Sequence, residues 1–405
     1  MAKLMIVLNR IVIGGAPADT VQLAGALSRE HETCLVSGAK VEDEKDAAYL
    51  LSDLKHIRHL EIKSMRRSIN PLYDWQAYCE LKKIIRSERP DIIHTHGAKP
   101  GFLARLAASR SGVPVIVHTY HGHIFHSYFN KLASFFFVAV ERWLARKSSA
   151  IIVLSESQKQ EIANCYRICP AEKISVIPLG LDIEPFVNGQ DEKRQRFRKK
   201  YGLEENESAI GLVGRIVKVK NHGFFLQVAS RLSKEMKREV KFFIVGDGNL
   251  RKKLEAEAVA LQLEPVSLLT SKEGKLVFTS WIREIDEVMA GLDIVTLTSF
   301  NEGTPVSLLE AQAAGKPIVA INVGGTADTM LDEESGFLLK DFDSDLFAQK
   351  LEWLVRHKSE AIQMGRKGRE YVKSTHPFKL QVEKTLQLYK SLLSNLKGSP
   401  NLRTG

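Results

Sequence analysis

Residues 210–221 read IGLVGRIVKVKN, and a helical spacing of apolar residues follows over Leu226–Met236. The short apolar run Ile210–Val213 is typical of a strand that is buried on both faces of a parallel sheet. A glycine turn between such a strand and a helix lies at the carboxyl edge of the sheet, where α/β proteins bind their ligands. The stretch therefore predicts a strand–loop–helix unit that presents Arg215 and Lys220 at a ligand-binding edge.

The same alternation of short apolar runs with longer amphipathic stretches fills both halves of the chain. The other runs after residue 200 are Lys241–Val245, Leu276–Phe278, Asp293–Leu297 and Ile318–Ala320, and Val306–Ala314 is a second helical stretch. The runs before residue 180 are Leu4–Leu8, Thr33–Val36, Asp91–His94, Val115–Thr119 and Ile151–Leu154. Strands that alternate with helices indicate βαβ units. We therefore predict an α/β fold with two Rossmann-like domains that face each other across a cleft.

The boundary between the two domains is predicted at residues 177–182, which read IPLGLD. Proline and glycine punctuate this segment, and a polar run continues to Lys200. A chain of 405 residues is about the right length for two domains. We place the N-terminal domain at residues 1–180 and the C-terminal domain at residues 181–376.

The composition is that of a globular protein without membrane spans. Hydrophobic residues make up 44% of the chain and charged residues 26%. The apolar runs are far shorter than the roughly 20 residues that a bilayer crossing needs. Gly14-Gly15 comes too early for a signal peptide, so we expect a cytoplasmic location. The four cysteines are expected to be reduced thiols.

The net charge of +10 favours anionic partners but does not distinguish nucleic acid, phospholipid and nucleotide diphosphate. The longest cationic run is residues 193–200, KRQRFRKK. A nucleic-acid patch is one interpretation. A solvated helix face is the better one, because the run lacks interleaved aromatic residues and follows Asp191 and Glu192. We expect no nucleic-acid partner.

Arg215 and Lys220 form a candidate site for a pyrophosphate. Both follow the strand at residues 210–213 and precede a helix, so a guanidinium, an ammonium and the helix dipole can meet one anion. Two surface cations at a helix start are the alternative. Gly14-Gly15 after the first strand is a weaker candidate for a phosphate-binding turn.

Glu302 and Glu310 lie eight positions apart in the segment NEGTPVSLLE, residues 301–310. At 3.6 residues per turn the two side chains point in directions within about 80° of each other if the helix begins near Glu302. Carboxylates accept hydrogen bonds from the hydroxyls that ribose and hexose rings offer. The pair therefore predicts a sugar-binding role.

These motifs together resemble glycosyltransferase family 4, over roughly residues 3–395. The resemblance is carried in the second half by Gly214-Arg215 with Lys220-Asn221, Val245-Gly246-Asp247-Gly248, Glu302 with Glu310, Gly315-Lys316-Pro317 and Val323-Gly324-Gly325. In the first half it is carried by Gly14-Gly15, Pro90 to His96 and Val117 to Gly122. It implies a GT-B fold and a reaction that retains the anomeric configuration. It also implies a donor-binding C-terminal domain, an acceptor-side N-terminal domain, and a helix at residues 377–395 that returns to the N-terminal domain. Residues 121–126, HGHIFH, are most similar to bacterial surface-polysaccharide enzymes.

The resemblance also implies a role for each candidate residue. Arg215 and Lys220 would bind the diphosphate, Glu310 the ribose and Glu302 the transferred sugar, and His121 would lie beside the donor sugar. The remaining donor-binding residues would be Gly14, Gly15, Gly214, Gly303, Thr304, Pro305 and Val306. The catalytic set would be His121, Arg215, Lys220 and Glu302. Asp328 and Ala16-Pro17 depart from the family pattern.

Metal and cofactor sites are disfavoured by the motifs. Six histidines fall within residues 94–126, but no carboxylate or thiolate with suitable spacing accompanies them. Asp341-Phe342-Asp343 resembles a metal-binding D-x-D motif, yet it precedes a helical pattern, so helix capping by Asp343 or Ser344 is the preferred interpretation. No G-x-G-x-x-G occurs, which disfavours a nicotinamide enzyme. We expect neither a metal nor a cofactor.

The sequence thus predicts a hexosyltransferase that moves a hexose or N-acetylhexosamine from a nucleotide sugar, UDP-sugar favoured, to a polysaccharide or lipid-linked saccharide. A sugar-nucleotide 2-epimerase and a non-catalytic nucleotide-sugar-binding subunit remain alternatives. Residues 129–147 read as an amphipathic helix with Leu132, Phe136, Val140 and Trp143 or Leu144 on one side. This helix is either a core helix or, together with Lys63, Arg66 and Arg67, part of a reversible contact with an anionic membrane. The second interpretation would place the protein peripherally on the inner face of the cell membrane.

Overall fold

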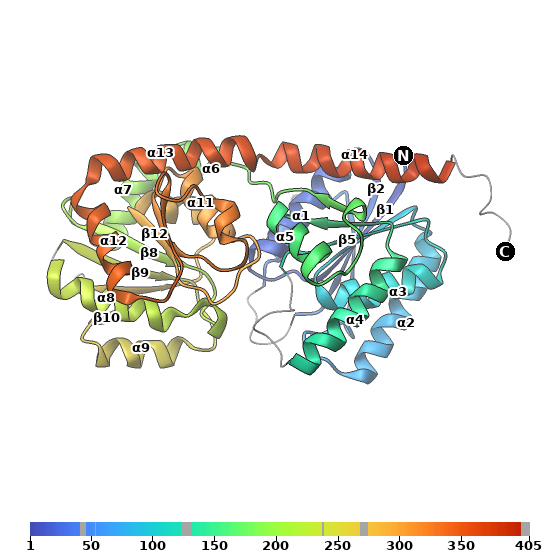
Figure 1. The fold of residues 1–405 in the computed structure, drawn as a ribbon, viewed down its shortest axis with the longest axis horizontal. Coiled ribbons are helices and arrows are strands. Elements are labelled where there is room, and N and C mark those ends of the chain that lie inside the picture. The colour runs from blue at the N-terminus through green and yellow to red at the C-terminus, as the bar shows by residue number, and fades with distance from the viewer. Residues whose placement is uncertain (41–45, 53, 123–130, 237–238, 268–273, 398–405) are drawn as a thin grey trace. The chain divides into compact units, whose positions relative to one another are not determined.

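The structure is a computed structural model that describes residues 1–405 except 41–45, 53, 123–130, 237–238, 268–273 and 398–405. The chain forms two compact units (Figure 1). One contains Met1–Gly180 together with the C-terminal residues from Phe378, and the other contains Leu181–Pro377. Each unit is a parallel sheet covered by helices, which confirms the prediction of an α/β fold with two Rossmann-like domains.

The sheet of the first unit has the strand order β3-β2-β1-β4-β5-β6-β7 in its described residues. The strands are β1 Lys3–Arg10, β2 Glu32–Gly38, β3 Arg58–Ile62, β4 Ile92–His96, β5 Val115–Thr119, β6 Ala150–Val153 and β7 Ile174–Val176. Leu4 and Ile6 of β1 pack into one core and Met5 and Val7 into another, because successive side chains of a strand point to opposite faces. The central strands are therefore apolar on both sides.

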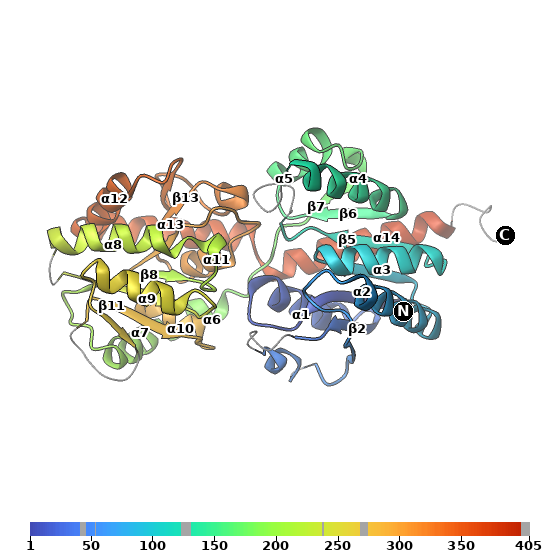
Figure 2. The ribbon, with the colours of Figure 1, turned by 90° about the horizontal axis from the view of Figure 1, so that it is seen from below.

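Two helical layers cover this sheet. The elements are α1 Gly15–Leu27, η1 Ala48–Leu51, α2 Pro71–Glu88, α3 Ala98–Arg110, α4 Lys131–Lys147, α5 Glu156–Gln160, η2 Glu161–Cys165, η3 Ala171–Lys173 and α14 Phe378–Lys397. Helices α1 and α14 share a core with Leu4 and Ile6, whereas α2 and α3 pack on the opposite face. Figure 2 shows α3 between α2 and α4. The last helix therefore packs on the first unit, as the resemblance implied.

Helix α4 buries only part of the side that its apolar spacing predicts, because Leu144 is buried whereas Phe136 and Trp143 are exposed. Phe136 is 63% exposed and Trp143 is 40% exposed, while Glu141 is buried. Glu141 accepts a hydrogen bond from Arg105 of α3 at 2.6 Å and one from Tyr120 at 2.6 Å. Because this buried pair needs Glu141 to face the sheet, the aromatic side chains turn outward. Phe129 of the predicted helix lies outside the described residues.

The second unit repeats the architecture with the strand order β10-β11-β9-β8-β12-β13-β14. Its strands are β8 Ser208–Val213, β9 Val240–Val245, β10 Pro265–Ser267, β11 Leu276–Ser280, β12 Ile294–Leu297, β13 Ile318–Ile321 and β14 Gly336–Leu339. Its helices are α6 Glu184–Val187, α7 Gln190–Lys200, η4 Lys218–Lys220, α8 His222–Met236, α9 Arg251–Ala260, α10 Ile285–Gly291, α11 Val306–Ala313, η5 Gly324–Thr329, α12 Ser344–Arg356 and α13 Lys358–Thr375. The predicted strands of this half all lie in its sheet.

The cationic run 193–200 belongs to α7 and is partly neutralised within the unit. Arg194 donates to Asp293 at 2.6 Å, and Arg196 pairs with Glu287 of α10 at 2.8 Å. The structure thus agrees with a helix face rather than a nucleic-acid patch. All four cysteines are free thiols, and no helix in the described parts of the chain is long and apolar enough to cross a membrane.

Candidate functional site

The loop after β8 holds Arg215 at the carboxyl edge of the second sheet. Its backbone is fixed by β9 and the residues after it, since Gly214 donates to the Val245 carbonyl at 2.9 Å and Ile216 to the Asp247 carbonyl at 2.8 Å. A Cβ at Gly246 would clash with the Gly214 carbonyl oxygen, so only glycine allows this close approach. Arg215 is exposed, and its guanidinium has no hydrogen-bond or ion-pair partner among the described residues.

Lys220 and Glu302, predicted separately, are in direct contact. The Lys220 Nζ atom donates to Glu302 Oε1 at 2.6 Å, and Ser299 Oγ donates to the same oxygen at 2.5 Å. Thr298 Oγ1 donates to the Lys220 carbonyl at 3.1 Å, which ties the loop after β8 to the end of β12. Both charged side chains are largely buried, so this pair is fixed more firmly than a surface ion pair. Ser299 is a site residue that sequence reasoning missed.

The loop that carries Glu302 is supported from behind by Gly324-Gly325. The Gly325 amide donates to the Glu302 carbonyl at 3.2 Å. Gly324 has φ +52°, and a Cβ there would clash with the Glu302 carbonyl oxygen. This explains why a second glycine-rich turn follows β13: it lets two loops pack backbone to backbone at one edge of the sheet.

Gly303, Thr304 and Pro305 form the turn that leads into α11, and Val306 is the first residue of that helix. No side chain caps this N-terminus. The first amides of a helix are donors without intrahelical partners, and the helix dipole makes this end attractive to anions. The predicted donor loop is therefore a short turn directly before an uncapped helix start.

Glu310 lies in α11 and differs from Glu302 in its surroundings. No described residue forms a hydrogen bond or ion pair with its carboxyl group. Burial raises its pKa from 4.5 to about 8, because no cation offsets the desolvation of the charge. An unpartnered carboxyl group with a raised pKa is a feature of functional sites. A ligand hydroxyl would supply the missing partner.

Gly14 and Gly15 lie where β1 leads into α1 in the first unit. Gly14 is the N-cap of α1 and Gly15 its first residue, and no side chain caps this helix. The turn thus presents a bare helix start at the carboxyl edge of the first sheet. Four residues further on, Asp19 is a buried carboxyl group.

His121 belongs to a buried polar cluster of the first unit. His121 Nε2 lies 2.9 Å from His96 Nδ1, and the ring of His96 lies 4.1 Å from that of His94. His94 in turn contacts Tyr389 Oη of α14 at 2.6 Å. Burial lowers the pKa of His121 to about 4 and that of His94 to about 3, so both imidazoles are neutral near pH 7.

Asp19 and Gln381 complete this cluster and were not predicted from the sequence. Gln381 Nε2 of α14 donates to Asp19 Oδ1 at 2.8 Å, and burial raises the Asp19 pKa to about 7 although this hydrogen bond opposes the rise. Asp19 Oδ2 lies 4.0 Å from His121 Nδ1, an atom without a hydrogen-bond partner in the described structure. Gln381 lies 362 positions from Asp19, so no local pattern could reveal the contact.

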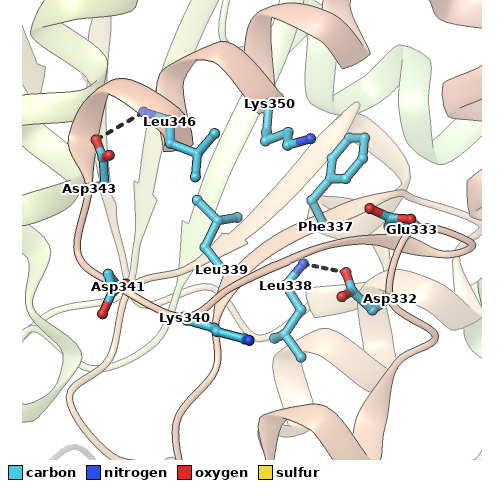
Figure 3. A pocket seen from close by; sticks show the side chains of 10 residues that line it. All are labelled: Asp332, Glu333, Phe337, Leu338, Leu339, Lys340, Asp341, Asp343, Leu346 and Lys350. Carbon is cyan, nitrogen blue, oxygen red and sulfur yellow. Dashed lines mark hydrogen bonds between the residues drawn. The ribbon is translucent and has the colours of Figure 1, made fainter.

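The alternative metal motifs do not form an ion site in the described residues. No group of three or more His, Cys, Asp or Glu side chains in these residues could hold a metal ion, and His123 and His126 lie outside them. Asp343 accepts hydrogen bonds from the amides of Asp345 and Leu346, at 2.9 and 3.0 Å, and caps α12 as predicted. Figure 3 shows the hydrogen bond from the Leu346 amide to Asp343 among the residues that line a pocket of the second unit.

Comparison with known proteins gives the family. A model described as Glycosyltransferase Family 4 matches residues 13–185, and one described as Glycosyl transferases group 1 matches residues 193–371. The Escherichia coli UDP-Gal:alpha-D-GlcNAc-diphosphoundecaprenol alpha-1,3-galactosyltransferase is 30% identical over 84% of this chain and 85% of its own length. This chain belongs to glycosyltransferase family 4.

Other similar proteins agree with this assignment. The Staphylococcus aureus capsular polysaccharide biosynthesis glycosyltransferase CapM is 22% identical over 87% of this chain and 92% of its own. The crystal structure of Anabaena HepE in complex with UDP and glucose has a TM-score of 0.78 at 17% identity, over 96% of this chain and 100% of that chain. The glycosyltransferase therefore has the GT-B fold of this family.

The structure of this glycosyltransferase places the predicted residues in two groups. Gly214, Arg215, Lys220, Glu302, the turn 303–306 and Glu310 lie at or next to the carboxyl edge of the second sheet. Gly14, Gly15 and His121 lie at the carboxyl edge of the first. Within each group, the residues follow different strands of one parallel sheet, which explains why residues far apart in the sequence meet.

Proposed function

We propose that the enzyme transfers a hexose or N-acetylhexosamine from a nucleoside diphosphate sugar, with UDP favoured as the nucleotide. The observation that carries the proposal is a set of charged residues on one sheet edge: the Lys220–Glu302 pair, with Arg215 and Glu310, whose side chains have no partner in the part of the chain that the structure describes. Together they offer cations for a diphosphate and carboxylates for sugar hydroxyls. The names of the E. coli relative and of the HepE complex, which include UDP, support the choice of nucleotide.

In this proposal the donor is bound by complementary charges. Arg215 and Lys220 bind the diphosphate, whose other neighbours are the free amides at the start of α11. Glu310 accepts hydrogen bonds from the ribose hydroxyls. Glu302 accepts from the transferred sugar while it holds the Lys220 ammonium in place. The anion and Glu302 thus share one ammonium group.

Catalysis in the proposal is electrostatic and retaining. The bond between the anomeric carbon and the diphosphate oxygen breaks, and the cations stabilise the charge that develops on the leaving group. The leaving oxygen takes the proton of the acceptor hydroxyl, whose oxygen attacks the anomeric carbon from the same face. Neutral His121 lies beside the donor sugar as a hydrogen-bond donor. No metal takes part, so EDTA should leave the rate unchanged.

The acceptor is proposed to be a polysaccharide or a lipid-linked saccharide. The printed names of the E. coli and S. aureus relatives, a diphosphoundecaprenol galactosyltransferase and a capsular polysaccharide enzyme, support this class. Both acceptors suit a cytoplasmic protein that contacts the inner face of the cell membrane reversibly.

The test is incubation of the purified protein with radiolabelled UDP- and GDP-sugars, with and without lipid-linked saccharide acceptors. We expect label to appear in the acceptor from a UDP-sugar, and NMR to show an α-linkage from an α-configured donor. Epimerised donor without any acceptor would instead indicate a 2-epimerase. Donor binding without turnover in any combination would indicate a binding subunit. A β-linked product would overturn the retaining mechanism.

A further inference from the structure

Asp19 is a buried carboxyl group that the proposed reaction does not use. It is the one ionisable residue of α1, and its side chain is 4% exposed. Helix α14 packs against α1 (Figure 1) and supplies Gln381, whose Nε2 atom donates to Asp19 Oδ1 at 2.8 Å. Gln381 Oε1 in turn accepts from the Gly180 amide at 3.0 Å. These two hydrogen bonds fix Asp19 Oδ1, so Oδ2 is the carboxyl oxygen that faces His121.

The contact between His121 and His96 limits where the proton of His121 can lie. Both imidazoles are neutral near pH 7, because burial lowers the pKa of each. A neutral imidazole carries one proton, and the 2.9 Å contact between His121 Nε2 and His96 Nδ1 needs one proton between these two atoms. If His96 supplies that proton, the proton of His121 lies on Nδ1. If His121 supplies it, His121 Nδ1 is bare and cannot donate.

Asp19 lies where its charge decides between these two tautomers. Asp19 Oδ2 is 4.0 Å from His121 Nδ1, which has no hydrogen-bond partner among the described residues. An ionised carboxylate at this distance favours a proton on Nδ1, whereas a protonated carboxyl group presents its own O–H and favours a bare Nδ1. The separation is longer than a hydrogen bond, so the Nδ1–H group stays available to a ligand oxygen. Nε2 is already used by His96.

We propose that Asp19 is a positioning residue for the transfer reaction, and that its ionised carboxylate holds His121 in the tautomer that donates from Nδ1. This role rests on the proposed function, in which neutral His121 donates a hydrogen bond beside the donor sugar. Gln381 supports the role, because it holds the carboxylate with Oδ2 towards the imidazole. Asp19 acts through His121 and needs no contact with the substrate.

The tautomer should change near neutral pH. Burial raises the pKa of Asp19 to about 7, and the hydrogen bond from Gln381 opposes this rise. The other ionisable groups of the cluster remain neutral as Asp19 titrates, because burial lowers the pKa of the histidines and raises that of the tyrosine; they are His94, His96, His121 and Tyr389. Ionisation of Asp19 therefore sets the tautomer by itself, and the donating form prevails above pH 7.

NMR of protein with 15N-labelled histidine tests the role without any turnover, because protonated and bare ring nitrogens differ in chemical shift. Wild type is compared with Asp19→Asn, and the spectrum of His121→Gln assigns the signals of His121. Asparagine keeps the acceptor for Gln381 and turns an amide NH2 towards Nδ1, so it imitates the protonated carboxyl group. Gln381→Leu is the second variant. The control is Asp91→Asn, an equally conservative change beyond the other end of β4, where Asp91 accepts from the Lys3 amide. Circular dichroism checks that each variant is folded.

We expect His121 of wild type and of the control to carry its proton on Nδ1 at pH 8.5 and on Nε2 at pH 5.5. Asp19→Asn should keep the proton on Nε2 at both pH values. Gln381→Leu should move the midpoint of the change to higher pH, because the hydrogen bond that lowers the Asp19 pKa is lost. In the transfer assay, Asp19→Asn should lower kcat at pH 8.5 roughly tenfold, on the scale of one hydrogen bond, and leave UDP affinity unchanged.

A His121 tautomer that responds neither to pH nor to Asp19→Asn would overturn the proposal, and so would wild-type kcat in that variant. Parallel losses of thermal stability, kcat and UDP affinity in Asp19→Asn would assign Asp19 a structural role instead. Wild type that shows the tautomer change but transfers no sugar from any UDP- or GDP-sugar would contradict the proposed function. The coupling of Asp19 to His121 would then stand without it.

Discussion

Replacing Glu310 by glutamine should stabilise the protein at alkaline pH while weakening donor binding. The Glu310 carboxyl has no partner among the described residues, and burial raises its pKa from 4.5 to about 8. Between these two pH values the folded chain holds a proton that the unfolded chain releases. The free energy of unfolding therefore falls as pH rises through this range, and the loss is complete above pH 8. Glutamine carries no charge, so the Glu310→Gln variant does not lose this stability at alkaline pH.

The size of the effect follows from the pKa. A rise from 4.5 to about 8 corresponds to roughly 5 kcal/mol, at 1.36 kcal/mol per pH unit. The side chain keeps some contact with solvent, which screens the charge, so we expect about half of this value. Glu310→Gln should thus be about 2–3 kcal/mol more stable than wild type at pH 8.5 and close to it at pH 5. The buried Asp19 contributes equally to the pH dependence of unfolding in both proteins, so its contribution cancels in the difference between them.

Thermal and urea unfolding at a series of pH values, followed by circular dichroism, measures this difference. Titration calorimetry with UDP at pH 8.5, where the Glu310 carboxyl is largely ionised, should show roughly tenfold weaker binding by the variant, on the scale of losing one hydrogen bond to a charged group. Glu334→Gln is the matched control, because its carboxylate is exposed and pairs with Lys367 on the surface. Parallel unfolding profiles of Glu310→Gln and wild type at every pH would refute the raised pKa, and unchanged UDP affinity would refute the ribose contact.

Four further substitutions test other parts of the structure. Arg215→Ala and Lys220→Ala should each lower kcat/KM by roughly 10²-fold in a steady-state assay, on the scale of losing one donor to a developing anion; wild-type kinetics would remove the diphosphate assignment. His121→Ala should lower kcat more than UDP affinity, and full turnover would place the catalytic group elsewhere. Asp343→Ala should cost about 1 kcal/mol in urea unfolding through the lost cap of α12 and leave kcat unchanged; lost activity would instead support a metal role.

The sequence predicts the central strands of both sheets and misses the edges. The four strands without a prediction are β3, β7, β10 and β14, and these are the two outermost strands of each sheet. Central strands are buried on both faces and read as continuous apolar runs. An edge strand such as Arg58–Ile62 is partly exposed and carries polar residues, so its apolar signal is broken.

The candidate site, like the sheets, was predicted only in part. The Lys220–Glu302 pair joins two motifs that were predicted separately, because each motif directly follows a buried strand of the same sheet. Asp19 and Gln381 were missed because their contact joins positions 362 apart and is fixed by packing. Ser299 was missed although its partner, Glu302, lies only three positions away. The exposure of Phe136 was missed as well, because the buried Glu141–Arg105 pair and Leu144 lie on the side of α4 that faces the unit's interior.

The position of α14 sets the order in which the chain can finish folding. Tyr389 is fully buried in the core of the first unit and contacts His94, 295 positions earlier. A ribosome adds about 5–20 residues per second, so the first unit waits on the order of 10 to 40 seconds for this helix while Leu181–Pro377 is made. The second unit is continuous and can fold as soon as it emerges. The half that is synthesised first is therefore completed last, and until then the apolar side of its sheet that α14 covers lacks that cover.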